Sequence, residues 1–77
     1  MKEKYLNVLR ELLESEEKDI NKVYVELIST PLSLINHSPA ETAQKTLQYT
    51  KVAKDYKNSQ TNENKLRLEK IIKELEQ

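Results

Sequence analysis

The chain has 77 residues, 36 % of them hydrophobic, and it contains neither glycine nor cysteine. A chain of this length forms one small domain, and without cysteine it can build neither disulfides nor a cysteine-ligated zinc site. The 13 basic and 13 acidic residues balance each other, whereas a dedicated nucleic-acid binder usually carries a basic excess. The composition therefore predicts a single domain over residues 1–77 with a core of Leu, Ile, Val and Tyr.

The sequence also lacks the signals that direct a protein into or across a membrane. No apolar run approaches the roughly 18 residues of a membrane-spanning helix. Residues 1–5 lead into a mixed helical pattern, which differs from the apolar stretch of a signal peptide. We therefore expect a cytoplasmic protein without a transmembrane segment. The frequent use of Lys, Glu, Asn and Ile is typical of AT-rich bacterial or phage genomes.

Residues 3–28 carry an apolar seam with the period of a packed α-helix. Its members are Leu6, Leu9, Leu13, Ile20, Val23 and Leu27, spaced by three, four or seven residues. This pattern predicts a helix that packs along its length against other helices.

Polar residues 15–19 interrupt this seam, and Glu16 takes a position where an apolar residue is expected. Ser15 or Asp19 could cap a second helix that starts here. Against a break, no glycine is present to close an upstream helix, and the apolar register stays in phase across the interruption. We therefore predict one long helix over residues 3–28, with two shorter helices as the alternative.

Both prolines of the chain lie in the next stretch, each directly after a hydroxyl residue. Proline fits the first position of a helix, where its missing N–H costs no hydrogen bond, and a preceding Ser or Thr can act as the cap. Thr30-Pro31 therefore predicts the end of the long helix and a one-turn helix over residues 31–36. Ser38-Pro39 gives a stronger signal, because Glu41 can complete a capping box at the start of the next helix.

The helix predicted over residues 39–57 has two apolar faces on opposite sides. One face consists of Ala40, Ala43 and Leu47, and the other of Tyr49, Val52, Ala53 and Tyr56. The tyrosine-containing stripe has two interpretations. Either the last helix folds back and covers it as core, or it stays partly exposed as an interface, a role to which tyrosine is suited.

Residues 58–62 are polar and predict a turn, and the last helix is predicted over residues 62–76. Its apolar face consists of Leu68, Ile71, Ile72 and Leu75. Every element predicted for this chain is a helix, and the connections between the helices are short. The predicted fold class is therefore all-α, a small antiparallel helical bundle.

The sequence offers little for catalysis or metal binding. His37 is the only histidine, so neither a second histidine nor a cysteine can join it in a metal site. The absence of glycine excludes a glycine-rich phosphate loop. The carboxylates of residues 14–19 are most simply a solvated run. We therefore expect no enzyme activity, no cofactor, no metal and no small-molecule substrate.

The remaining features favour binding to another protein. A bundle this small gains buried area when it binds a partner or associates with itself. The predicted contact residues are Leu32, Leu34, Ile35, Tyr49, Val52 and Tyr56. The chain is thus predicted to be a small regulatory or inhibitory module that acts by protein–protein contact, either with an unidentified protein or as a homodimer.

Two other functions remain as alternatives. The helix over residues 40–57 carries Gln44, Lys45, Gln48 and Lys51, residue types that contact bases and phosphates in DNA-binding regulators. Nucleic-acid binding is the less favoured prediction, because the gap between the first and third predicted helices exceeds the short turn of a helix-turn-helix motif. An immunity or antitoxin protein is the second alternative, by analogy with other small helical bundles and without a supporting motif.

Overall fold

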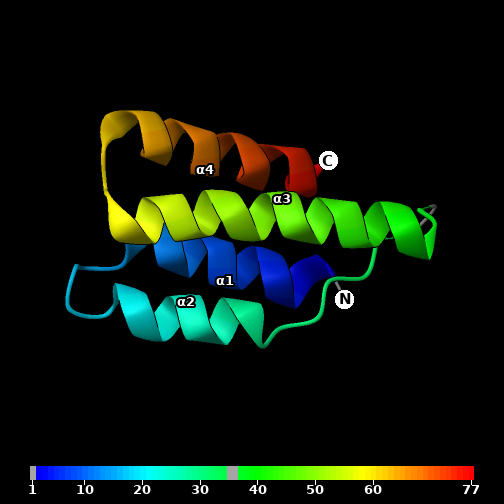
Figure 1. The fold of residues 1–77 in the computed structure, drawn as a ribbon, viewed down its shortest axis with the longest axis horizontal. Helices are drawn as coiled ribbons and strands as arrows, with labels where there is room; N and C mark the ends of the chain where they lie inside the picture. Colours follow the sequence, from blue (N-terminus) through cyan, green and yellow to red (C-terminus); the bar gives the residue numbers. More distant parts are fainter. Residues whose placement is uncertain (1, 35–36) are drawn as a thin grey trace.

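Four α-helices make up the computed structural model, which describes residues 2–34 and 37–77 (Figure 1). They are α1 (Lys2–Glu14), α2 (Ile20–Ile28), α3 (Pro39–Asn58) and α4 (Asn62–Glu76). No strand occurs among the described residues, so the predicted all-α class is confirmed. Within the same residues, no helix has both the length and the apolar character that crossing a membrane requires.

The helices form a ring in which neighbours run antiparallel. α1 packs against α2 and α4, and α3 packs against the same two helices. α1 and α3 therefore lie across the bundle from each other and point the same way (Figure 1). Both chain ends and the connector between α2 and α3 lie at one end of this bundle, whose extents are 35 × 22 × 18 Å. This is the predicted small antiparallel helical bundle.

Each helix turns one apolar face toward a shared core. The buried apolar residues are Tyr5, Leu6, Val8, Leu9 and Leu12 of α1; Ile20, Val23 and Leu27 of α2; Tyr49, Val52, Ala53 and Tyr56 of α3; and Leu68, Ile71, Ile72 and Leu75 of α4. Within each helix they recur at three- and four-residue intervals, the spacing that places side chains on one face. Full burial of one large aliphatic side chain contributes about 1.5–3 kcal/mol.

The single long helix predicted for the first part of the chain is wrong, because the helix ends at Glu14 and a second one begins at Ile20. The end of α1 is closed without glycine. The Ser15 hydroxyl donates a hydrogen bond to the Glu11 carbonyl at 2.6 Å. The Tyr56 hydroxyl, from α3, donates to the Leu13 carbonyl at 3.0 Å. Side chains thus satisfy carbonyls that a glycine-containing turn would otherwise bind through the backbone.

The polar run marks the turn itself. Glu16 is exposed there, and its carbonyl accepts hydrogen bonds from the N–H groups of Asp19 at 2.9 Å and Ile20 at 3.0 Å. Asp19 is the N-cap residue of α2, as its position suggested, but its side chain makes no capping hydrogen bond. The apolar register continues across the turn because α1 and α2 face the same core.

Thr30 closes α2 and does not start a new helix. Its hydroxyl donates to the Glu26 carbonyl at 2.7 Å, and the Ser29 hydroxyl donates to the Val25 carbonyl at 2.9 Å. The predicted one-turn helix is absent from residues 31–34, since the hydroxyl expected to cap it points back into α2. The rest of that predicted helix lies outside the described residues.

α3 and α4 begin and end within one residue of their predicted bounds. At the start of α3 the predicted capping box is present. The Glu41 N–H donates to the Ser38 hydroxyl at 3.1 Å, and the Ser38 N–H donates to the Glu41 carboxylate at 3.5 Å. Pro39 follows this cap as the first helical residue, where it gives up no hydrogen bond.

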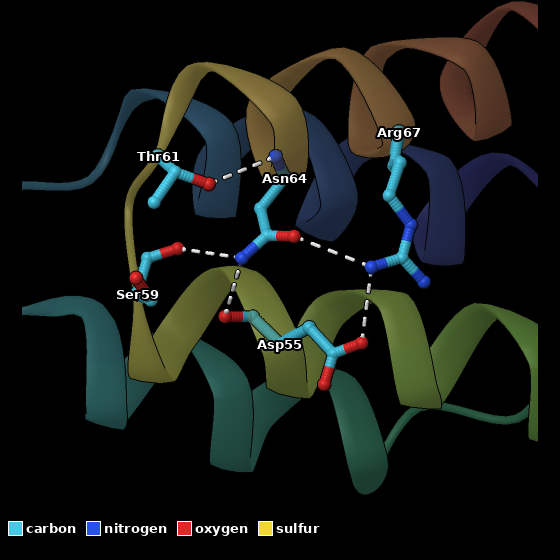
Figure 2. Close-up of polar contacts among 5 residues, drawn as sticks. All are labelled: Asp55, Ser59, Thr61, Asn64 and Arg67. Carbon is cyan, nitrogen blue, oxygen red and sulfur yellow. Dashed lines mark hydrogen bonds and ion pairs between the residues drawn. The ribbon is translucent and has the colours of Figure 1, made fainter.

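Side chains also fix the turn between α3 and α4 (Figure 2). The Asn64 amide donates to the Ser59 carbonyl at 2.9 Å and to the Asp55 carbonyl at 3.3 Å. Arg67 donates to the Asn64 side-chain oxygen at 3.2 Å and pairs with the Asp55 carboxylate at 3.1 Å. Thr61 caps α4 by accepting from the Asn64 N–H at 3.1 Å. Asn64 therefore links the end of α3 to the start of α4.

Candidate partner-binding surface

The two halves of α3 differ in burial. From Pro39 to Gln48 no side chain is buried, and the first buried residue is Tyr49. α3 has 20 residues whereas α2 has 9, and the first turns of α3 extend past the ends of the other helices (Figure 1). The first half of α3 is thus a well-capped helix that contributes no buried side chain to the core.

The connector and this half of α3 line a groove with a volume of about 690 Å³. Its apolar members, which together we call the connector–α3 surface, are Leu32, Leu34, Pro39, Ala43 and Leu47. Leu32 and Leu34 are half-buried against the core and form the inner wall. Leu47 forms the outer edge and is 73 % exposed, more than any other large hydrophobic side chain among the described residues.

The setting of Leu47 distinguishes it from a chance exposed leucine. Leu66 of α4 is 65 % exposed and does not line this groove, and single exposed leucines are common on protein surfaces. Leu47 borders a groove whose other wall is also apolar. An apolar residue at such an edge adds to the exposed apolar area around the groove.

The end of α2 carries another exposed apolar side chain. The Lys57 ammonium of α3 lies 5.2 Å from the centroid of the Tyr24 ring, so Tyr24 faces α3. Ile28 follows one turn later on the same side of α2 and is 55 % exposed. The chain then passes directly into the connector.

The structure buries the tyrosine-containing stripe that the sequence left open as a possible interface. Tyr49, Val52 and Tyr56 are 1 %, 7 % and 6 % exposed, so the interpretation of the stripe as core is the correct one. α4 packs along this side of α3, and the ring of Tyr5 from α1 lies 6.4 Å from that of Tyr49. The stripe is therefore closed off by two helices.

The other predicted contact residues have separate outcomes. Leu32 and Leu34 lie half-buried on the connector–α3 surface, and their role as contact residues stays a prediction. Ile35 lies outside the described residues.

The four residues considered for nucleic-acid contact differ in their surroundings. Gln44, Gln48 and Lys51 are exposed on α3. Lys45 instead pairs with Glu74 of α4, with 2.9 Å between the ammonium and the carboxylate. One of the two basic residues in the set thus already serves to join two helices.

Glu74 links Lys45 to the core. The hydrogen bond from Lys45 lowers the pKa of the Glu74 carboxyl. The same carboxylate accepts a hydrogen bond from the Tyr49 hydroxyl at 3.4 Å. Burial raises the pKa of the Tyr49 phenol to about 12, and the negative charge of Glu74 acts in the same direction. At neutral pH the Glu74 carboxyl is therefore ionised and the Tyr49 phenol is neutral.

A second cavity of about 720 Å³ lies at the same end of the bundle, between α1, the connector, α3 and the end of α4. Lys2, Glu3, Lys45 and Glu74 contribute charges of both signs to its lining. Across residues 2–34 and 37–77 no group of three or more potential metal ligands comes together. The cavity thus presents neither a metal-binding cluster nor a single preferred charge.

Sequence reasoning missed Leu47 as a site residue, although it placed Leu47 on a face with Ala40 and Ala43. The only signal was that two apolar stripes compete for one core, and a small bundle can cover only one of them.

Comparisons with protein-family models, with curated proteins and with solved structures found no match to this chain, so its function has to be argued from its own surface.

Proposed function

We propose that this chain is a non-enzymatic regulatory or inhibitory module of the cytoplasm that binds a protein partner through the connector–α3 surface. The observation that carries the proposal is the state of the first half of α3. It is a capped helix that buries none of its side chains and holds Leu47 73 % exposed beside an apolar groove. Burying such a side chain stabilises a structure by about 1.5–3 kcal/mol, and a partner can supply that burial.

Several charged side chains are already paired between helices, which supports the same proposal because these charges are not free to recognise a partner. Arg10 of α1 pairs with Glu76 of α4 at 2.6 Å, and Arg67 of α4 pairs with Asp55 of α3 at 3.1 Å. Lys45 and Glu74 form a third pair between α3 and α4. Their partial exposure limits each pair to roughly 0–1 kcal/mol, so the pairs add little to stability but occupy the charges involved.

DNA binding through α3 draws less support. Phosphate contacts need several unpaired basic side chains on one face. Lys45 is occupied by Glu74, and an exposed leucine, Leu47, stands in the middle of the helix. A protein partner makes use of that leucine, whereas a phosphate backbone does not.

Affinity purification with matched variants tests the proposal. The bait proteins are the wild type, Leu47→Asp and Leu66→Asp, used with nuclease-treated lysate of the source cells. Both substitutions replace an exposed leucine, so circular dichroism should show unchanged folding for both. We expect wild type and Leu66→Asp to retain a common protein that Leu47→Asp loses.

Retention of the same proteins by Leu47→Asp would contradict the proposal. Sedimentation velocity, which measures the oligomeric state, tests the case in which the partner is a second copy of the chain. The partner would be a second copy of this chain if the wild type and Leu66→Asp dimerise and Leu47→Asp stays monomeric.

A further inference from the structure

The outer side of α3 carries one stripe that joins an apolar half to a basic half. Ala40, Ala43, Leu47, Lys51 and Lys54 follow one another at intervals of three or four residues, so they lie on one face of the helix. All five are exposed. The stripe begins beside the groove and ends in two lysines.

These two lysines differ from the other lysines of α3. Lys45 pairs with Glu74, and the Lys57 ammonium lies over the Tyr24 ring. Lys51 and Lys54 make no ion pair with any residue in the described part of the chain. The one aspartate of α3, Asp55, is taken by Arg67. The basic half of the stripe therefore has no carboxylate of its own.

Helix geometry fixes how a partner would have to be arranged. With a rise of about 1.5 Å per residue, Lys51 lies roughly 6 Å and Lys54 roughly 10 Å along the axis from Leu47. A partner helix laid along the stripe meets the apolar half first and the lysines four and seven residues further on. The whole stripe from Ala40 to Lys54 is about 21 Å long, which corresponds to about 15 helical residues.

We infer that the segment docking on the connector–α3 surface is an acidic amphipathic helix of a different protein. Its apolar anchor packs beside Leu47 in the groove, and carboxylates four and seven residues from the anchor face Lys51 and Lys54. This inference rests on the proposed function and specifies the chemistry of the partner. It is an instance of helix-in-groove recognition in which opposite charge sets the register.

A second copy of the chain fits this surface less well. A two-fold dimer brings the same patch of both copies together. The stripe contains lysines and no carboxylate, so it offers Lys51 and Lys54 no acidic group in such a dimer. Nucleic acid also fits less well, because two lysines make few phosphate contacts and Leu47 finds no apolar partner on a phosphate backbone.

The test is a selection from a displayed library of helices about 15 residues long, with the positions on one face randomised. The library is selected on the wild type, on Lys51→Glu/Lys54→Glu, and on Leu47→Asp. A control bait, Lys4→Glu/Lys65→Glu, changes net charge equally at two exposed lysines elsewhere. We expect the wild type and the control to enrich Asp and Glu four and seven residues from an apolar position.

Charge reversal should invert this preference. Lys51→Glu/Lys54→Glu should enrich Lys and Arg at the same two positions, and Leu47→Asp should enrich no helix. Replacing the two acids of a selected peptide by Gln should weaken its binding to the wild type by about 2- to 30-fold, the range expected for two exposed charge pairs.

Three outcomes overturn the inference, and they are distinguishable. In the first outcome, the wild type enriches helices and Leu47→Asp does not, but these helices show no acidic preference and no response to Lys51→Glu/Lys54→Glu. This outcome refutes the acidic partner and leaves the proposed function standing. No enrichment by the wild type above Leu47→Asp counts against both. In the third outcome, a duplex DNA probe binds the wild type but not Lys51→Glu/Lys54→Glu, and its binding weakens as salt rises. This outcome assigns the face to nucleic acid instead.

Discussion

Removing the hydroxyl of Tyr56 should destabilise the bundle by about 1 kcal/mol, although the ring remains in place. Tyr56 is 6 % exposed, and its hydroxyl donates at 3.0 Å to the Leu13 carbonyl in the last turn of α1. Tyr56→Phe keeps the buried ring area and leaves this carbonyl without its donor. A lost hydrogen bond costs about 0.5–1.5 kcal/mol net, and a fully buried unpaired acceptor costs up to about 3 kcal/mol. Leu13 is only partly buried, so water can partly replace the hydroxyl, and the lower figure applies.

The measurement is urea unfolding followed by circular dichroism. Thermal unfolding gives a second measurement, because for a domain of this size a loss of 1 kcal/mol corresponds to a fall of about 4–8 °C in Tm. The slope of the unfolding free energy against urea should stay the same, because the surface exposed on unfolding hardly changes. Amide hydrogen exchange should quicken in the turn between α1 and α2, since the hydroxyl holds the end of α1.

Tyr24→Phe is the matched control. Tyr24 is half-buried, and its hydroxyl makes no hydrogen bond with a described residue, so the same chemical change should alter stability by less than about 0.5 kcal/mol. If Tyr56→Phe proves as stable as Tyr24→Phe, the hydroxyl does not close α1, and the account of the break between α1 and α2 fails.

Three further experiments test other parts of the structure. Asn64→Ala removes the hydrogen bonds to the end of α3 and should lower the free energy of unfolding by about 1–2 kcal/mol; an unchanged urea midpoint would refute the role of the amide. The pKa of Glu74 is lowered by Lys45, so the unfolded chain takes up the proton first as pH falls. The stability difference between wild type and Glu74→Gln should therefore be full above about pH 4.5 and shrink below it, and a pH-independent difference would contradict this. Leu68→Ala should lower the free energy of unfolding by about 2–5 kcal/mol, and Leu47→Ala should lower it by less than about 0.5 kcal/mol. If thermal unfolding shows equal losses for the two variants, Leu47 belongs to the core.

Local signals were enough to predict α3 and α4. The capping box of Ser38 and Glu41 places the start of α3, the polar residues 58–62 precede the start of α4, and the period of the apolar residues places the core face of α4. These signals act within one helical turn, so they are readable from a short stretch of sequence.

The break between α1 and α2 could not be read in that way. The sequence lacks the glycine that usually closes a helix, and one of the two side chains that close α1 in its place belongs to Tyr56, 43 residues from Leu13. A contact of this kind exists only once the bundle has formed. The chain's unbroken apolar register reflects the shared core and does not require one helix.

The choice between the two faces of α3 has a physical reason that the sequence contained. A tyrosine buries roughly 150–250 Å², far more than an alanine can. Covering Tyr49 and Tyr56 therefore hides more apolar area than covering Ala40 and Ala43, and α4 packs over the tyrosines. Comparing the two stripes by area would have placed Leu47 on the outside.

The glycine-free turns have a consequence for how the chain tolerates mutation. The residues that flank the helices have negative φ angles, −105° at Asp19, −90° at Ser29 and −152° at Ser59, which any L-amino acid can adopt. Saturation mutagenesis should therefore find that β-branched and bulky residues are accepted at Asp19 and Ser59, whose side chains bind no helix carbonyl. The intolerant positions should be those whose side chains bind helix carbonyls, such as Gln60, whose amide donates to the Tyr56 carbonyl at 2.6 Å. In this protein, side-chain hydrogen bonds to helix carbonyls fix the shape of the turns. Substitution there is therefore limited by the need for a polar side chain and not by the backbone φ angle.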